Sequence, residues 1–167
     1  MFRIDKAAIT AFLVIIFDQW TKWLAFETIS PGETVNVMPL VSFGRTENEG
    51  IAFGLLAEHP VAVFSLMAVA LTVLVFFYAR HRSRPGLWLA TGLLLGGAIG
   101  NAIDRIWLGY VRDFIELPAF PSFNIADVAI TVGVIFLVIA VELNARREAE
   151  LAESAPDTAP VEGAGDD

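Results

Sequence analysis

The chain contains four long apolar segments, which cover residues 7–26, 61–79, 87–103 and 125–143. A helix needs roughly 20 mostly apolar residues to cross a bilayer, and each segment reaches or approaches that length. Helices of a water-soluble bundle would carry a polar face, whereas residues 61–77 contain only Ser65 and Thr72 as polar side chains. The pattern therefore predicts an all-α membrane protein with four transmembrane helices.

The first apolar segment has a second interpretation, because a cleaved signal peptide also contains an apolar run. Here the run is longer than the usual core of about 7–15 residues, and it contains Asp18 and Lys22. It shows no convincing small-residue cleavage site. We therefore expect this segment to be retained as the first span.

Basic residues are distributed unevenly among the connections between these segments. One side holds seven bases: Arg3, Lys6, Arg80, Arg82, Arg84, Arg146 and Arg147. The other side holds Arg45, Arg105 and Arg112, which are spread over two longer loops. Because Lys and Arg concentrate in cytoplasmic connections, we expect both termini to be cytoplasmic and loops 27–60 and 104–124 to face outward.

One of the outward loops carries a strand pattern. Residues 34–43 alternate polar and apolar positions, and Pro39 interrupts the run. The apolar positions with a period of two are Val35, Val37, Val41 and Phe43. Period-two alternation is typical of a half-buried strand, so we expect a small β-sheet on the outer membrane surface.

Composition agrees with a membrane location and adds an acidic tail. Of the 167 residues, 56% are hydrophobic and 18% are charged, and the mean hydropathy is +0.63. Soluble domains usually contain about 25% charged residues. The formal net charge is −8, but residues 148–167 hold seven acidic residues and no basic one. We therefore expect a four-span domain over residues 1–147 and a disordered cytoplasmic tail over residues 148–167.

Other counts exclude several functional classes. The chain has no basic patch, so nucleic-acid binding is not expected. It contains no cysteine, which excludes disulfides, thiol catalysis and zinc–thiolate sites. The two histidines, His59 and His81, do not form the HExxH arrangement of a metalloprotease helix.

Ionisable groups within the apolar segments are costly and therefore need an explanation. Asp18 and Lys22 are four residues apart, so they share one helix face and can neutralise each other. We expect a structural ion pair rather than a catalytic pair. The alternative is that the Lys22 side chain extends to the outer interface.

A second polar cluster follows the glycine-rich residues 96–100, which allow close helix packing in lipid. Asn101 and Asp104 are three residues apart and face the same way on a helix. Arg105 can pair with a carboxylate, or with a carbonyl or phosphate of a substrate. For Asp104, next to Arg105, we slightly favour an ionised structural acid over a catalytic one.

A third cluster combines Asp113 with Asn124 and Asp127. Helix capping alone explains Asn124 and Asp127, since they begin the fourth span three residues apart. It does not explain Asp113, but turns at Pro118 and Pro121 can bring Asp113 to face Asp127. Two close carboxylates in a pocket of low dielectric share one proton. Such a pair can activate water and protonate a leaving amine, as in an aspartic protease.

Four ordered segments resemble lipoprotein signal peptidase, the bacterial signal peptidase II. They are residues 17–22 (FDQWTK), residues 48–54 (NEGIAFG), residues 97–105 continuing through Gly109 to Phe114, and residues 123–127 (FNIAD). Each lies on the expected span or outer loop, and together they extend the resemblance over roughly residues 7–145.

The resemblance implies an aspartic endopeptidase of the bacterial cytoplasmic (inner) membrane. It would cut prolipoproteins before a diacylglyceryl-modified cysteine at the outer face, among membrane lipids. Such enzymes need no metal or cofactor, are inhibited by the cyclic peptide globomycin, and are expected here to act as a monomer. The resemblance makes Asp113 and Asp127 the catalytic pair. Its supporting positions fall into two groups: Asn48, Asn101, Arg105 and Asn124 for substrate binding or dyad support, and Asp18, Lys22, Gly50 and Asp104 for the local fold.

Two positions depart from the family pattern. Ile51 stands where alanine is common, which would alter the shape of the pocket slightly. Arg112 stands before the catalytic Asp113, where an apolar residue is common. A cation beside Asp113 would favour the ionised form of that carboxyl.

Three other functions are less well supported by the residues. Paired membrane acids also serve in proton-coupled transporters, but here the acids gather at one face and Glu142 is isolated near the other. A non-catalytic assembly factor with GxxxG-like packing would leave Asp113 unexplained. Serine-type intramembrane proteolysis has little support, because Ser65 is the only serine within a span.

Overall fold

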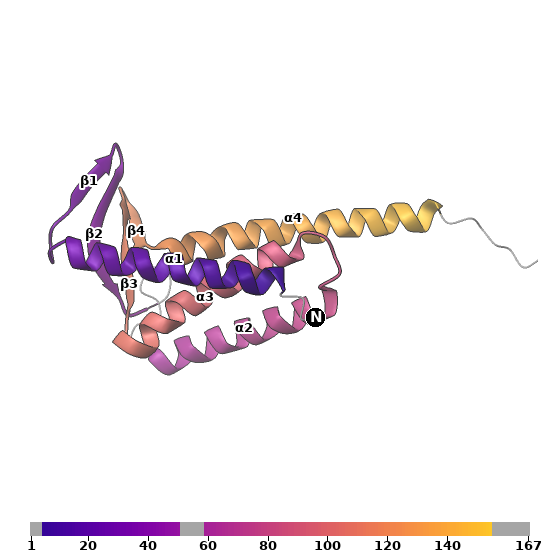
Figure 1. Cartoon of the computed structure of the whole chain (residues 1–167), viewed down its shortest axis with the longest axis horizontal. Coiled ribbons are helices and arrows are strands. Elements are labelled where there is room, and N and C mark those ends of the chain that lie inside the picture. Colours follow the sequence, from indigo (N-terminus) through magenta and orange to yellow (C-terminus); the bar gives the residue numbers. More distant parts are fainter. Residues whose placement is uncertain (1–4, 51–58, 155–167) are drawn as a thin grey trace, which may run out of the picture.

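The computed structural model describes residues 5–50 and 59–154, which form four helices and one four-stranded antiparallel sheet (Figure 1). In chain order these elements are α1 (Lys6–Thr28), β1 (Val35–Met38), β2 (Val41–Asn48), α2 (Pro60–His81), α3 (Leu87–Leu108), β3 (Val111–Leu117), β4 (Phe120–Phe123) and α4 (Ile125–Ser154). The predicted fold class, four membrane-spanning helices with a small sheet, is confirmed. Arg3, residues 51–54 of the second motif including Ile51, and residues 155–167 of the tail lie outside the described residues.

Each predicted apolar segment lies within one helix that is long and apolar enough to cross a membrane. The helices extend a few residues beyond most of the predicted ends. Helix α4 extends furthest, to Ser154, and projects past the other helices at the end opposite the sheet (Figure 1). Residues 144–154 are rich in Ala, Glu, Arg and Leu, which favour helix, and Glu142 pairs with Arg146 at i,i+4. The boundary expected at residue 148 thus falls inside α4.

The helix bundle has a polar, small-residue interior and an apolar exterior. The fully buried side chains include the charged Asp18 and Lys22. Half of the residues in the most apolar stretch of α3 are buried inside the bundle. Large apolar side chains point outward instead, among them Phe12 (62% exposed), Val73 (61%) and Val138 (63%). Lipid solvates such side chains well, so this arrangement is the one expected of helices in a membrane.

Helix α3 packs against both α1 and α4, and its glycines allow the close contact. A Cβ atom at Gly96 would lie 2.6 Å from the Cβ of Val14 in α1. A Cβ atom at Gly97 would collide with the backbone oxygen of Ala126 in α4. The predicted role of this glycine-rich segment in close helix packing is therefore confirmed.

The sheet covers one end of the bundle in the order β1-β2-β3-β4 (Figure 1). Strands β1 and β2 form the predicted strand segment, and Pro39 lies in the turn between them, followed by Leu40 at φ 71°. The hairpin of β3 and β4 was not predicted as strands. It turns at Pro118 and Ala119 and returns the chain to the start of α4.

An apolar cluster helps to hold the sheet on the helices. Phe114 of β3 packs with Ala25 and Ile29 at the end of α1 to form a buried apolar cluster. Phe43 of β2 meets Phe114 edge-to-face, with 5.8 Å between the ring centroids. The strand that carries Asp113 is thereby placed directly above the helix ends.

The substitution Gly97→Ala tests the helix packing. Alanine is favoured over glycine in a helix by about 1 kcal/mol, so propensity alone predicts stabilisation. The collision with the Ala126 backbone instead predicts a loss of about 1–3 kcal/mol, the usual cost of overpacking. Unfolding in detergent micelles measures the change. Val134→Ile, which adds a methyl group at a lipid-facing position that is 48% exposed, is the control and should leave stability unchanged. A stabilised Gly97→Ala protein would contradict the packing described here.

Candidate active site

Polar side chains gather in the buried region where α1, α3 and α4 meet the sheet. Lys22 and Asp18 lie on one face of α1 and are both completely buried. The Lys22 Nζ atom lies 2.9 Å from Asp18 Oδ2 and 3.3 Å from Asp104 Oδ2. The predicted i,i+4 ion pair is confirmed, and Lys22 faces the bundle interior rather than the outer interface.

Asp18 also connects α1 to α4. Its Oδ1 atom accepts a hydrogen bond of 2.8 Å from the backbone N–H of Ala126, in the first turn of α4. A helix N-terminus has unpaired N–H groups and a partial positive charge, so it stabilises a carboxylate there. Asp18 thus sets the position of the α4 N-terminus relative to α1.

Asp104 is bound mainly by Arg112, and its sequence neighbour Arg105 binds elsewhere. Arg112 donates to Asp104 from its backbone N at 3.0 Å, from Nε at 3.3 Å and from Nη2 at 2.7 Å. Arg105 donates from Nη2 to the backbone oxygen of Gly50 at 2.6 Å. Adjacent residues on a helix do not face each other, which is why Asp104 and Arg105 have different partners. The contacts agree with a structural acid at position 104.

Asn124 and Asp127 cap the fourth helix reciprocally. The backbone N–H of Asn124 donates to Asp127 Oδ2 at 3.1 Å, and the backbone N–H of Asp127 donates to Asn124 Oδ1 at 3.0 Å. The capping interpretation is therefore correct, but it is incomplete. The Nδ2 group of Asn124 also donates to Asp113 Oδ1, so the same residue joins the two carboxylates.

Asp113 lies on β3 and is only 1% exposed. Its Oδ2 atom accepts a 2.9 Å hydrogen bond from Asn48 Nδ2, and its Oδ1 atom is bound by Asn124. Burial raises the pKa of the Asp113 carboxyl to about 6; the hydrogen bond from Asn48 opposes this shift and the charge of Asp127 adds to it. Asp113 is thus a carboxyl group able to hold a proton near neutral pH.

The amide of Asn48 is held in a defined orientation. Its Oδ1 atom accepts from the backbone N–H of Gly50 at 3.0 Å, which leaves Nδ2 to donate to Asp113. Gly50 is itself held through the hydrogen bond from Arg105 to its carbonyl oxygen. Pairing of β2 with β3 brings Asn48 beside Val111, two residues from Asp113.

Asn101 of α3 completes the connection to Asp127. Its Nδ2 group donates to Asp127 Oδ1 at 2.8 Å. Its Oδ1 atom accepts from Lys22 Nζ at 2.9 Å and from Asn124 Nδ2 at 3.2 Å. The predicted site residues therefore form one hydrogen-bonded network, in which Asp113 and Asp127 share Asn124 as a common partner.

One expectation about this network is wrong. Arg112 was expected to favour the ionised form of Asp113, but the pKa of Asp113 is raised and Arg112 binds Asp104. Successive side chains of a strand point to opposite faces, so sequence neighbours on β3 lie in different surroundings.

Gln19 was not assigned a role from the sequence, although it belongs to the first motif. Its Nε2 group contacts Asp18 at 3.2 Å and Asp104 at 3.2 Å, and its Oε1 atom accepts from Arg112 Nη2 at 2.9 Å. The sequence feature that indicates such a role is a polar amide side chain next to Asp18 inside an apolar span.

A cavity of about 720 Å³ opens beside this network, within the range of small-molecule and peptide sites. Its polar lining comes mainly from Asn48, Asn101, Arg105 and Asp127, and most of its wall is apolar. Asp113 lies behind this lining and reaches it through Asn48. No group of three or more His, Cys, Asp or Glu side chains that could hold a metal occurs within residues 5–50 and 59–154.

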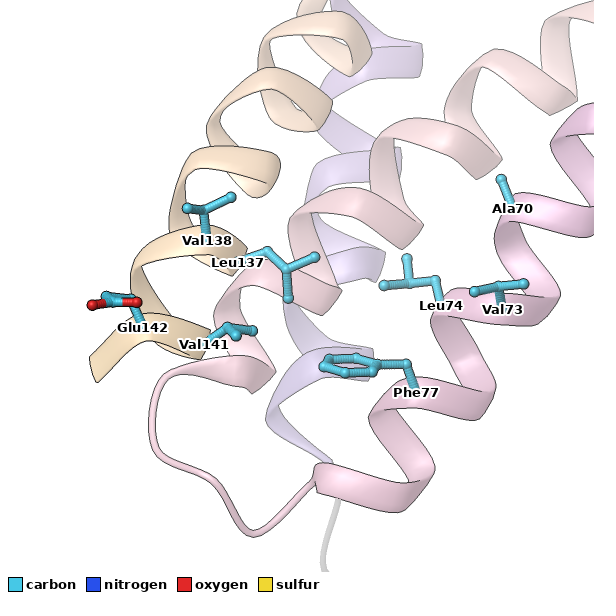
Figure 2. A pocket seen from close by; sticks show the side chains of 8 residues that line it. All are labelled: Ala70, Val73, Leu74, Phe77, Leu137, Val138, Val141 and Glu142. Carbon is cyan, nitrogen blue, oxygen red and sulfur yellow. The ribbon is translucent and has the colours of Figure 1, made fainter. Parts of the chain in front are cut away.

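A second cavity, of about 750 Å³, lies between α2 and α4 (Figure 2). Figure 2 shows Leu74 and Phe77 of α2 pointing toward Leu137 and Val141 of α4. Ala70 of α2 lines both cavities.

Comparison with known proteins agrees with this geometry. Residues 10–143 match the family model of signal peptidase (SPase) II. The lipoprotein signal peptidase of Thermodesulfovibrio yellowstonii is 36% identical over 141 residues, which cover 81% of this chain and 94% of that protein. The lipoprotein signal peptidase of Moorella thermoacetica is 41% identical over 129 residues, covering 76% and 86%.

Two solved structures, each described as a bacterial membrane enzyme, share the fold. One has a TM-score of 0.79 and 34% identity and covers 86% of this chain and 92% of the other. The second has a TM-score of 0.75 and 35% identity and covers 84% and 94%. Family model, relatives and fold lead to the same conclusion: the chain belongs to the signal peptidase II family.

Proposed function

We propose that this chain is an aspartic endopeptidase that removes signal peptides from prolipoproteins, cutting before a diacylglyceryl-modified cysteine. Asp113 and Asp127 are the catalytic pair of this proposal. The observation that carries it is that Asn124 donates hydrogen bonds to both carboxylates, at one end of a four-helix membrane bundle. Membership in the signal peptidase II family and the lipoprotein signal peptidases among the relatives support the same substrate class.

The proposed reaction is hydrolysis of one peptide bond by one water molecule. Asp113 holds the proton of the pair, because burial raises its pKa to about 6, and it supplies this proton as the scissile carbonyl is attacked. Asp127 accepts a proton from water as the oxygen attacks that carbonyl carbon. The tetrahedral intermediate collapses as the nitrogen of the leaving amine takes up a proton from the pair. The products are a new carboxyl terminus on the signal peptide and a free amine on the cysteine.

The three asparagines hold the two acids at defined positions. Asn48 and Asn124 each donate to Asp113, while Asn101 donates to Asp127. An amide donor stabilises the ionised form of a carboxyl group without adding charge, so Asn48 and Asn124 oppose part of the rise in the Asp113 pKa that burial causes.

Arg105 is proposed to bind a carbonyl group of the substrate backbone. It lines the cavity beside Asp127, and its Nε atom is buried without a hydrogen-bond partner among the residues that the structure describes. An unpaired buried N–H is costly, and a peptide carbonyl in the cavity would satisfy it.

We also propose that the chain is a monomer of the bacterial cytoplasmic membrane, with both termini cytoplasmic and the sheet outside. In support, the arginines that follow α2 and lie within the long extension of α4 are at the end opposite the sheet (Figure 1).

Asp113→Asn and Asp127→Asn test the catalytic pair. Removing a general acid or base lowers turnover by about 10²–10⁴-fold, and each variant should lose that much. The measurement is cleavage of a diacylglyceryl-modified prolipoprotein by protein reconstituted in lipid. Glu116→Gln, which removes an acid from the same strand β3 outside the network, is the matched control and should retain full turnover. Robust cleavage by either Asp variant would refute the pair, and no cleavage by the wild type would refute the function.

The pH dependence tests the proton-holding role of Asp113. A required proton on a group with a pKa of about 6 makes kcat/KM fall as pH rises above about 6. Asn48→Ala removes a hydrogen bond that favours the ionised carboxylate, so it should move this decline to higher pH. A decline that stays at the same pH, or moves lower, in Asn48→Ala would contradict the assignment. Because protonation of one acid affects protonation of the other, the pKa read from the pH profile belongs to the pair and not to Asp113 alone.

A further inference from the structure

Arg112 joins the strand of one catalytic acid to two helices. Its side chain is 16% exposed and leaves β3 on the face opposite Asp113. There it donates from Nη2 to Asp104 of α3 at 2.7 Å and to Gln19 of α1 at 2.9 Å. The Arg112 backbone N–H donates to the same Asp104 carboxylate at 3.0 Å, so both main chain and side chain are held.

Strand pairing holds this part of β3 along one edge only in the described part of the chain. On one edge, residues 111–113 of β3 pair with residues 46–48 of β2. The register of this pairing shifts between Phe43 and Thr46 of β2. On the other edge, β3 pairs with β4 only from Ile115 onward in the described part of the chain. The segment that carries Asp113 is therefore paired along one edge. Phe114 attaches it to the end of α1 by apolar packing, and Arg112 adds charged hydrogen bonds to α1 and α3.

Arg112 also completes the charge balance below the site. Asp18 and Asp104 contribute two buried negative charges, and Lys22 lies within 3.3 Å of both. Without the Arg112 guanidinium, one ammonium would face two carboxylates in a region of low dielectric. Lys22 would then be drawn toward Asp104, away from Asn101, which it binds at 2.9 Å and which binds Asp127.

We propose that Arg112 is a positioning residue, which through Asp104 and Gln19 holds the Asp113 strand in place for reaction with Asp127. This rests on the proposed function, in which Asp113 is catalytic. The planar guanidinium donates to both oxygens of Asp104, a geometry that fixes orientation as well as charge. Lysine has the charge but not the planar fork, so it cannot reproduce the arrangement.

The experiment compares kcat and KM for a diacylglyceryl-modified prolipoprotein in Arg112→Met, Arg112→Lys and wild type. Arg112→Met keeps most of the apolar stem and loses the guanidinium. It should lower kcat about tenfold or more, because small misplacements of a catalytic group have effects of that size, and leave KM within about twofold. Arg112→Lys should recover part of the lost kcat. If Arg112→Met does not fold, a wild-type kcat in Arg112→Lys would still overturn the proposal.

Arg45→Met is the matched control for loss of a sheet-to-helix arginine. Arg45 lies on β2, donates to the Phe26 backbone oxygen of α1 at 3.0 Å and stacks over the Phe26 ring. It should lower thermal stability while leaving kcat unchanged. An equal fall of kcat in Arg45→Met would reduce Arg112 to a merely structural role and overturn the proposal.

A double-mutant cycle with Asp104→Asn identifies the partner. If Arg112 acts through Asp104, the double variant should lose far less kcat than the product of the two single losses. If the two losses of kcat multiply independently, Arg112 does not act through Asp104 and the proposal is overturned.

Asp113→Asn, measured in parallel, separates the Arg112 proposal from the proposed catalytic pair. If it is inactive while Arg112→Met has wild-type kcat, only the Arg112 proposal fails; if Asp113→Asn remains active, the proposed catalytic pair fails.

Discussion

Burial of the Lys22 ammonium constrains the architecture more than any other interaction. An isolated charge in a region of low dielectric is very costly, so partners must lie around it on every side. Asp18 supplies one from α1, and Asp104 and Asn101 supply two more from α3. Asp18 in turn binds the first turn of α4 through Ala126. Three helices are thereby fixed at one depth relative to each other, and the glycines of α3 allow the close approach that these short contacts require.

The active-site network is built directly on that constraint. From Lys22, one path runs through Asn101 to Asp127, and another runs through Asp104 to Arg112 and the strand of Asp113. Each of the two proposed catalytic acids is therefore supported from the same buried amine, although one lies on a helix and the other on a strand. Polar groups inside a membrane protein are costly unless fully paired, and this pairing gives both acids defined positions.

The exterior of the bundle is apolar, in contrast to the polar interior. Large apolar side chains face lipid, and α2 stands far enough from α4 to leave an apolar cavity between them (Figure 2). That cavity shares Ala70 with the cavity beside Asp127, whose wall is also mostly apolar apart from a few polar groups.

Local patterns in the sequence were enough to predict the four spans, the Asp18–Lys22 pair and the capping role of Asn124 and Asp127. Each depends on residues within about four positions, where helix periodicity alone decides which side chains meet. The β3 and β4 strands escaped prediction, because their residues lack regular alternation and include proline.

Only the tertiary structure decided the partners of Asp104, Arg105 and Arg112. Their neighbours along the chain proved to be the wrong partners, since adjacent side chains diverge on both helices and strands. The meeting of Asp113 with Asn48 likewise needed strand pairing between residues 65 positions apart. The sequence by itself determined which elements form and which acids required an explanation. The fold determined which of them meet, because contacts between distant segments depend on packing that no local pattern encodes.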